Sequence, residues 1–215
     1  MGRKLIKRAF LLLAIATLEV SLCTCKVNIK PNVKDIIEKA EKSIKDDSDD
    51  KEENDLFSEL AGNYTFTSGA GGWSNDIKLE SDGTFTGNYH DTDYINEYGE
   101  EEYTIYQSLF HGKFSNLEQV NDYTYSADLV SFAYDMKKGE RIKKDDRTYV
   151  NVAAYGIEKC RTVYFYLKGA PIDSLPSDFV SWGDGPVGLT DAESELPTHG
   201  FYSVEDETGF FLIDE

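Results

Sequence analysis

The chain has 215 residues, of which 40 are Asp or Glu and 22 are Lys or Arg, so its formal net charge at pH 7 is −18. This acidity argues against binding to nucleic acid or to an anionic membrane surface, because both carry the same sign of charge. It permits basic protein partners and cations, and it favours solubility.

The first 25 residues predict an export signal. An apolar run at 9–18 is followed by small and polar residues, and it is too short to span a bilayer, which takes about 20 apolar residues. Removal of residues 1–25, with four basic and one acidic residue, leaves 18 basic and 39 acidic residues, a net charge of −21. Four basic residues precede the apolar run: Arg3, Lys4, Lys7 and Arg8.

Two cysteines directly follow this signal, in Leu22-Cys23-Thr24-Cys25. The segment resembles the lipobox of bacterial lipoproteins, which places an apolar residue three positions before the modified cysteine. Leu22 occupies that position for Cys25, although Thr24 stands where the family has Gly, Ala or Ser. Val20 occupies it for Cys23, the alternative. The resemblance implies a diacylated cysteine, whose two chains would hold the protein at the outer face of the cell membrane. Secretion without a lipid is the other reading.

The third cysteine, Cys160, lies between Lys159 and Arg161. If Cys25 is lipidated, Cys160 is the only thiol left and the mature fold has no internal disulfide. If Cys23 is lipidated, Cys25 is free to pair with Cys160. A basic setting lowers the pKa of a thiol, but no partner base is evident, so we expect Cys160 to be a packed residue rather than a nucleophile.

Residues 26–55 predict a tether made of a helix and an acidic linker. Apolar residues at helical spacing indicate a helix over about 33–45, with Asn32 as its N-cap. Residues 46–55 contain seven acidic residues and one lysine, a run that repels itself and stays extended. This run lacks the glycine and the ligand spacing of an EF-hand calcium loop.

Residues 56–215 predict a single domain that is mainly β. Alternating segments rich in Tyr and Phe follow one another with short turns, and Ser81-Asp82-Gly83 predicts a hairpin. A turn around 174–182 is the one helical stretch expected after Leu60. We expect an antiparallel meander that closes into a lipocalin-like barrel, with a β-sandwich as the alternative. The expected strands lie within residues 62–67, 76–80, 84–90, 102–114, 122–134, 147–156, 161–167, 200–206 and 209–213.

Two resemblances accompany this pattern. A helical turn at 55–60 leading into Gly62-x-Tyr64 resembles the opening of lipocalin-like barrels, although Tyr64 replaces the usual tryptophan. Residues 68–93, 111–115 and 121–125 together resemble a family of uncharacterised predicted lipoproteins from Gram-positive gut bacteria. The second resemblance implies export and a β fold. It implies no activity, so no functional residue is carried over.

Motifs of common enzyme classes are missing, including G-x-S-x-G, H-E-x-x-H and the P-loop. The most suggestive stretch is 89–93, where strand alternation would place His90 on one face and both Asp91 and Asp93 on the other. Two carboxylates at a strand end suit a hard cation such as calcium, or the acid and base of a glycoside hydrolase. A solvated acidic loop is the third reading. The single histidines have no ligand spacing, which argues against zinc.

The two tryptophans, Trp73 and Trp182, both lie beside glycine-containing loops. Such residues either stack on a ligand or plug the end of a barrel. The sequence therefore favours an extracytoplasmic, membrane-anchored binding module for a small ligand or an envelope component, with Trp73, His90, Asp91, Asp93 and Trp182 as candidate ligand-binding residues. A carboxylate-dependent hydrolase of carbohydrate or cell-wall material and a structural envelope protein are the alternatives.

Overall fold

A computed structural model of the chain describes residues 55–95, 101–190 and 193–213. The predicted export signal, both candidate lipidation sites and the tether helix lie outside these residues. The described residues belong to one compact unit, Asp46–Glu215. No helix within them is long and apolar enough to cross a membrane.

Within the described residues, ten strands form one sheet, and eight of them close into an antiparallel barrel. Around the barrel the order is β1-β2-β3-β4-β5-β8-β9-β10, and β10 pairs with β1. Each strand pairs with the next barrel strand along the chain, so the predicted mainly β fold with a closed antiparallel meander is confirmed. The strands are β1 (Gly62–Thr67), β2 (Trp73–Leu79), β3 (Thr84–Ile95), β4 (Glu101–Asn121), β5 (Thr124–Tyr134), β6 (Arg141–Lys144), β7 (Arg147–Asn151), β8 (Thr162–Tyr166), β9 (Gly200–Ser203) and β10 (Thr208–Leu212).

The predicted hairpin at Ser81-Asp82-Gly83 joins β2 to β3. Asp82 Oδ1 accepts hydrogen bonds from the backbone N–H and the hydroxyl of Thr84, at 3.0 and 2.6 Å, which fixes the turn and lowers the pKa of the Asp82 carboxyl. Gly83 has φ 79°, and a Cβ there would lie 2.5 Å from the carbonyl oxygen of Phe114. The turn therefore requires glycine for both its conformation and its space.

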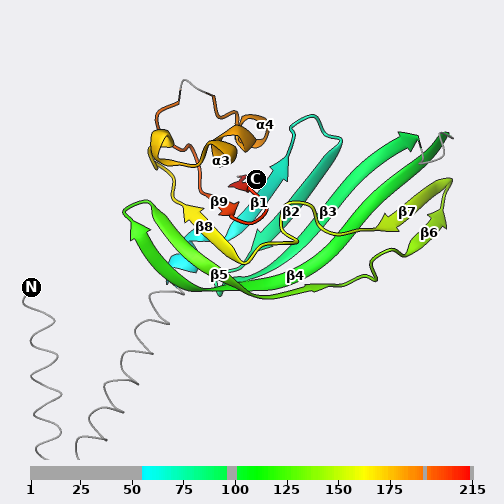
Figure 1. Cartoon of the computed structure of the whole chain (residues 1–215), viewed down its shortest axis with the longest axis horizontal. Helices are drawn as coiled ribbons and strands as arrows, with labels where there is room; N and C mark the ends of the chain where they lie inside the picture. The colour runs from blue at the N-terminus through cyan, green and yellow to red at the C-terminus, as the bar shows by residue number, and fades with distance from the viewer. Residues whose placement is uncertain (1–54, 96–100, 191–192, 214–215) are drawn as a thin grey trace, which may run out of the picture. The chain divides into compact units, whose positions relative to one another are not determined.

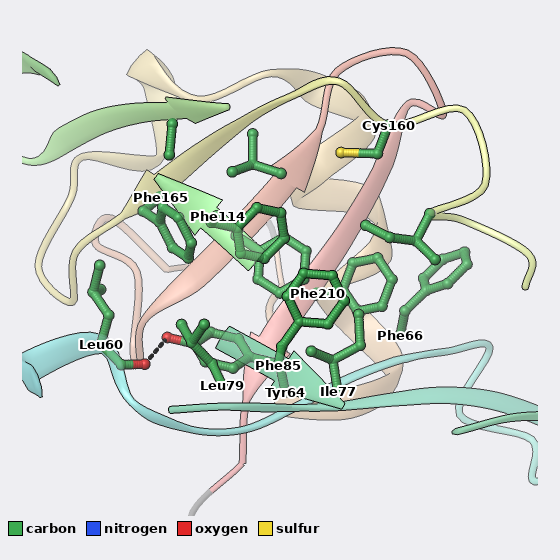
Figure 2. Close-up of a cluster of buried hydrophobic side chains, with 14 of the residues drawn as sticks. Leu60, Tyr64, Phe66, Ile77, Leu79, Phe85, Phe114, Cys160, Phe165 and Phe210 are labelled. Atoms are coloured by element: carbon green, nitrogen blue, oxygen red, sulfur yellow. Dashed lines mark hydrogen bonds between the residues drawn. The ribbon is translucent and has the colours of Figure 1, made fainter. Parts of the chain in front are cut away.

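Aromatic rings fill the inside of the barrel. Phe114 stacks on Phe85 at 4.7 Å between ring centroids, and Phe201 stacks on Phe210 at 4.5 Å. Phe165 lies edge-on to Phe114 at 5.7 Å. Figure 2 shows several of these rings, contributed by strands from around the barrel, in one contiguous cluster. The inward positions thus form a solid core.

The end of the barrel where β1 begins is closed by a helical segment over residues 55–60. Its Phe57 and Leu60 are buried, and Phe57 packs edge-on against Phe165 at 6.1 Å. Tyr64 donates a buried hydrogen bond of 2.7 Å to the carbonyl oxygen of Leu60 (Figure 2). Burial raises the pKa of Tyr64, so this hydroxyl keeps its proton and the bond.

A second apolar cluster lies outside the barrel between β10 and two short helices, α3 (Ser177–Trp182) and α4 (Asp184–Val187). Phe179 of α3 is fully buried and stacks on Phe211 at 4.7 Å. The predicted helical turn around 174–182 thus corresponds to the 3-10 turn Ile172–Ser174 and α3.

The strands β3 and β4 continue past the barrel and pair there with further strands. We call this extension of the sheet the wing (residues 91–95, 101–107 and 141–151). There β4 pairs with β3 on one edge and with β7 in parallel on the other, and β6 covers the far edge of β7. Figure 1 shows β3 and β4 running outward from the barrel to meet β6 and β7. The sequence did not predict β6, because four residues with three basic side chains carry no alternating pattern.

Candidate functional site

The structure divides the predicted site residues between the two faces of the sheet. Asp91 pairs with Trp73 of β2 and with Tyr106 of β4, on the face that continues the barrel interior. His90 points to the outer face, where its Nδ1 lies 3.2 Å from the hydroxyl of Ser74. Asp93 lies farther out, in the wing, and is exposed. The five predicted residues therefore do not form one site.

Both tryptophans meet at the open end of the barrel, although 109 positions separate them. Trp73 and Trp182 are 6.2 Å apart between ring centroids, and both lie edge-on to the buried Phe66, at 4.8 and 4.7 Å. Tyr155 lies 5.6 Å from Trp73 and is half exposed. Trp182 Nε1 donates to the carbonyl oxygen of Glu207 at 3.2 Å. The two rings therefore pack against the core at this end of the barrel, and a role of Trp73 and Trp182 in ligand binding stays a prediction.

The carboxylate of Asp91 is engaged locally. It accepts the backbone N–H of Thr92 at 2.7 Å and hydrogen-bonds to the hydroxyl of Tyr89. Burial, with smaller contributions from Asp91 and Tyr155, raises the pKa of Tyr89 to about 12, so the phenol stays protonated at neutral pH. Asp91 thus favours the protonated phenol of Tyr89 at the rim of the core.

Three buried side-chain oxygens have no hydrogen-bond partner: Asn75 Oδ1 and Ser108 Oγ near this end of the barrel, and Thr104 Oγ1 in the strands that extend beyond it. Asn75 and Ser108 flank Tyr89 in one cross-strand row, and Asn75 Nδ2 donates to the carbonyl oxygen of Tyr155 at 2.8 Å. A bound water with two or more polar neighbours would satisfy such atoms. No three or more His, Cys, Asp or Glu side chains of the described segments are grouped to hold a metal, and the predicted calcium binding stays a prediction.

A hollow of ligand size lies on the outside of the barrel, across β1, β2, β3 and β4. We call it the β1–β4 groove; its volume is about 450 Å³, within the range of small-molecule sites. Its floor is the cross-strand row Tyr64, Ile77, Gly87 and Phe110. The three side chains of this row are at most 1% exposed because they point into the core, so the outer surface there is bare backbone.

Two flanking rows of outward side chains form the walls of the groove. One row runs from Asn63 through Lys78 to Thr86. The other runs from Asp76 through Asn88 to Leu109. The groove therefore crosses the strands. Each row continues by one residue: Ile213, whose N–H donates to the Asn63 carbonyl, extends the first row, and Asp135, whose N–H donates to the Leu109 carbonyl, extends the second, both at 2.9 Å.

The floor of the groove depends on Gly87, because an aromatic ring of the core occupies the space where its side chain would be. The ring of Phe110 lies directly under it, only 2.1 Å from where a Cβ would stand. Any side chain at this inward position would displace the ring, so glycine lets a large aromatic residue pack under the middle of the groove.

The charged groups of the groove all have partners. Asp76 accepts from the hydroxyls of Thr65 and Ser74, each at 2.7 Å. Lys78 pairs with Glu80 at 2.8 Å, which raises the pKa of Lys78. Asp135 lies 2.7 Å from Nδ1 of His111.

The neutral polar groups of the groove are Asn63, Thr86 and Asn88, and none of them hydrogen-bonds to another described residue through its side chain. They offer two amides and one hydroxyl, which both donate and accept hydrogen bonds. Sequence reasoning missed this site because its residues span 63–213. The one available signal was the polar outward half of the alternating strands.

Cys160 is a buried free thiol at the margin of the core (Figure 2). Burial raises its pKa to about 12. The thiol is therefore protonated at neutral pH and a poor nucleophile, as expected for a packed residue.

Comparisons with protein-family models, curated proteins and solved structures found no match, so the lipoprotein and lipocalin-like resemblances stay predictions.

Proposed function

We propose that this chain is an exported, lipid-anchored binding module that holds a small polar ligand in the β1–β4 groove. The observation that carries this proposal is the hollow itself: about 450 Å³, lined by polar groups with unused hydrogen-bonding capacity. The filled barrel leads us to place the ligand outside, since the interior that a lipocalin-like protein would use is occupied by aromatic rings.

A thermal-shift screen of the unit Asp46–Glu215 tests the proposal, because the barrel and both apolar clusters lie within that unit. The panel contains calcium, fatty acids, cell-wall fragments and sugars. A ligand at 100 times its dissociation constant adds about 2.7 kcal/mol to the free energy of unfolding. For a domain of this size, the melting temperature should rise by roughly 5–10 °C.

A variant that fills the groove locates the site. Asn88→Trp places a large side chain in the wall, whereas Ser131→Trp makes the same change at an exposed position of β5 outside the groove. We expect the shift to disappear in Asn88→Trp and to persist in Ser131→Trp. A shift that survives in Asn88→Trp, or a panel without any shift, would refute the proposed site.

The lipid anchor has its own test in the producing bacterium. Cys25→Ser should move the whole chain from the membrane fraction to the medium, because it removes both acyl chains. Cys23→Ser is the matched control and should leave the protein on the membrane. The opposite result would assign the lipid to Cys23, and membrane retention of the double variant would argue against a lipid anchor.

A further inference from the structure

The β1–β4 groove also carries an inference about the class of its ligand, which rests on the proposed function. We infer that the groove takes a linear, uncharged, polyhydroxylated chain, that is, a neutral oligosaccharide lying across the strands. Shape, charge and hydrogen-bonding chemistry point to this class independently.

The shape of the groove suits one extended chain. The groove crosses four neighbouring strands, and strands lie about 4.8 Å apart, so the outer two are separated by roughly 14 Å. The two walls rise from positions two residues apart along each strand, a separation of about 7 Å. A long, narrow channel of this kind fits several linked units better than one compact molecule.

The charge of the groove suits a neutral ligand. Asp76 is held by two hydroxyls, and Lys78 and Asp135 are paired with Glu80 and His111. A charged ligand of either sign would meet a side chain of like charge along the groove, since Asp76, Lys78 and Asp135 all line it. A ligand without charge leaves the pairs intact.

The hydrogen-bonding groups suit hydroxyls. The amides of Asn63 and Asn88 stand in opposite walls, on β1 and β3, and Thr86 adds a hydroxyl on β3. Each amide offers both a donor and an acceptor, which matches sugar hydroxyls in either orientation. At the two ends, Leu109 and Ile213 are 45% and 37% exposed and can cover the apolar face of a terminal ring.

Calorimetric titration of Asp46–Glu215 with neutral oligosaccharides of different length tests the inference. The probes are cellotetraose, fully N-acetylated chitotetraose and maltotetraose with their monomers. At least one tetramer should bind about tenfold more tightly than its monomer, because it reaches two or more further hydrogen-bonding groups. Its affinity should change little between low and high salt, because no ion pair is formed.

Single amide deletions then test whether one chain spans the groove. Asn63→Ala and Asn88→Ala should each weaken tetramer binding by about three- to tenfold. Gln119→Ala removes an exposed amide from β4 outside the groove and should change nothing. Equal binding of monomer and tetramer, or tighter binding of a charged oligomer or a peptide in the groove, would overturn the inference while leaving the proposed function standing. If Asn88→Trp, which fills the groove, changes the binding of no ligand, both the inference and the proposed function fail.

Discussion

The barrel and the wing share two long strands, yet the same strands behave differently in each. Within β4, Phe110 and Phe114 are at most 1% exposed where the strand lines the barrel, whereas Tyr103 is 40% exposed in the wing. The barrel closes on itself, so an inward ring of one strand can meet a ring of a distant strand, as Phe114 of β4 meets Phe201 of β9. The wing is more open: all four residues of β6 are exposed, although Thr104, Thr148 and Val150 are buried.

This difference indicates that the barrel contributes more than the wing to the stability of the domain. A sheet needs a second layer to bury its apolar face, and in this domain the second layer is the far side of the barrel. The wing is held by strand pairing and by small surface contacts, such as Arg147 over the ring of Tyr103 at 5.1 Å. Side-chain deletions should therefore be costly in the barrel and mild in the wing.

The largest expected effect comes from Phe114→Ala. This ring contacts Phe85, Phe165 and Phe201, and its loss leaves a cavity that should lower the free energy of unfolding by about 3–5 kcal/mol. Urea denaturation measures the change, and Phe114→Leu provides a milder variant should alanine prevent folding. Tyr103→Ala is the wing control, for which we expect less than about 1 kcal/mol. Equal losses at both sites would contradict the contrast.

A smaller effect is expected from Tyr64→Phe, which keeps the ring and deletes one buried hydrogen bond. The carbonyl of Leu60 would lose its 2.7 Å donor inside the closed end of the barrel, at a cost of about 1–3 kcal/mol. Denaturation of this variant beside Tyr103→Phe separates the bond from the ring. An unchanged midpoint for Tyr64→Phe would mean that water replaces the hydroxyl.

Sequence reasoning found the barrel because local signals agreed with the global fold. The Asp82-Gly83 turn and the alternation along β2 and β3 specify a hairpin and its inward face without any long-range information. The same alternation placed His90 and Asp91 on opposite faces. Closure into a barrel followed from the number of short strands and the need to cover edges.

The groove and the wing were beyond such reasoning. The walls of the groove depend on which residue of β1 faces which residue of β2, β3 and β4, and one sequence does not give the register across four strands. The wing arises because β4 changes partner from β5 to β7 along one edge. Similarly, the meeting of Trp73 and Trp182 depends on α3 packing against β10.

The contact between Arg147 and Tyr103 offers a weaker test inside the wing itself. An exposed cation–π pair contributes about 0.5–1 kcal/mol. Arg147→Met keeps much of the side-chain length and removes the charge, so stability should fall by no more than that amount. A double-mutant cycle with Tyr103→Leu isolates the pair, and a coupling energy near zero would mean that strand pairing alone holds this part of the wing.

The smallest expected effect concerns pH and Asp206, in the turn between β9 and β10 of the barrel. Burial raises the pKa of this carboxyl, although the hydroxyl of Ser203 and the N–H of Lys159 donate to it and oppose the rise. A carboxyl whose pKa is higher in the folded than in the unfolded protein favours folding when protonated. Its stabilising contribution is therefore complete below the ordinary aspartate pKa of about 4 and is lost as the pH rises through the folded-state pKa.

Asp206→Asn removes this titration while keeping an amide oxygen for Lys159. The melting temperature of the variant relative to the parent should therefore increase as the pH is raised from 4 towards 7. Asp146→Asn, at an exposed turn of the wing, is the matched control. A flat difference for Asp206→Asn would mean that the two hydrogen bonds fully offset the burial of this carboxyl, and that the barrel turn tolerates charge as easily as the open wing does.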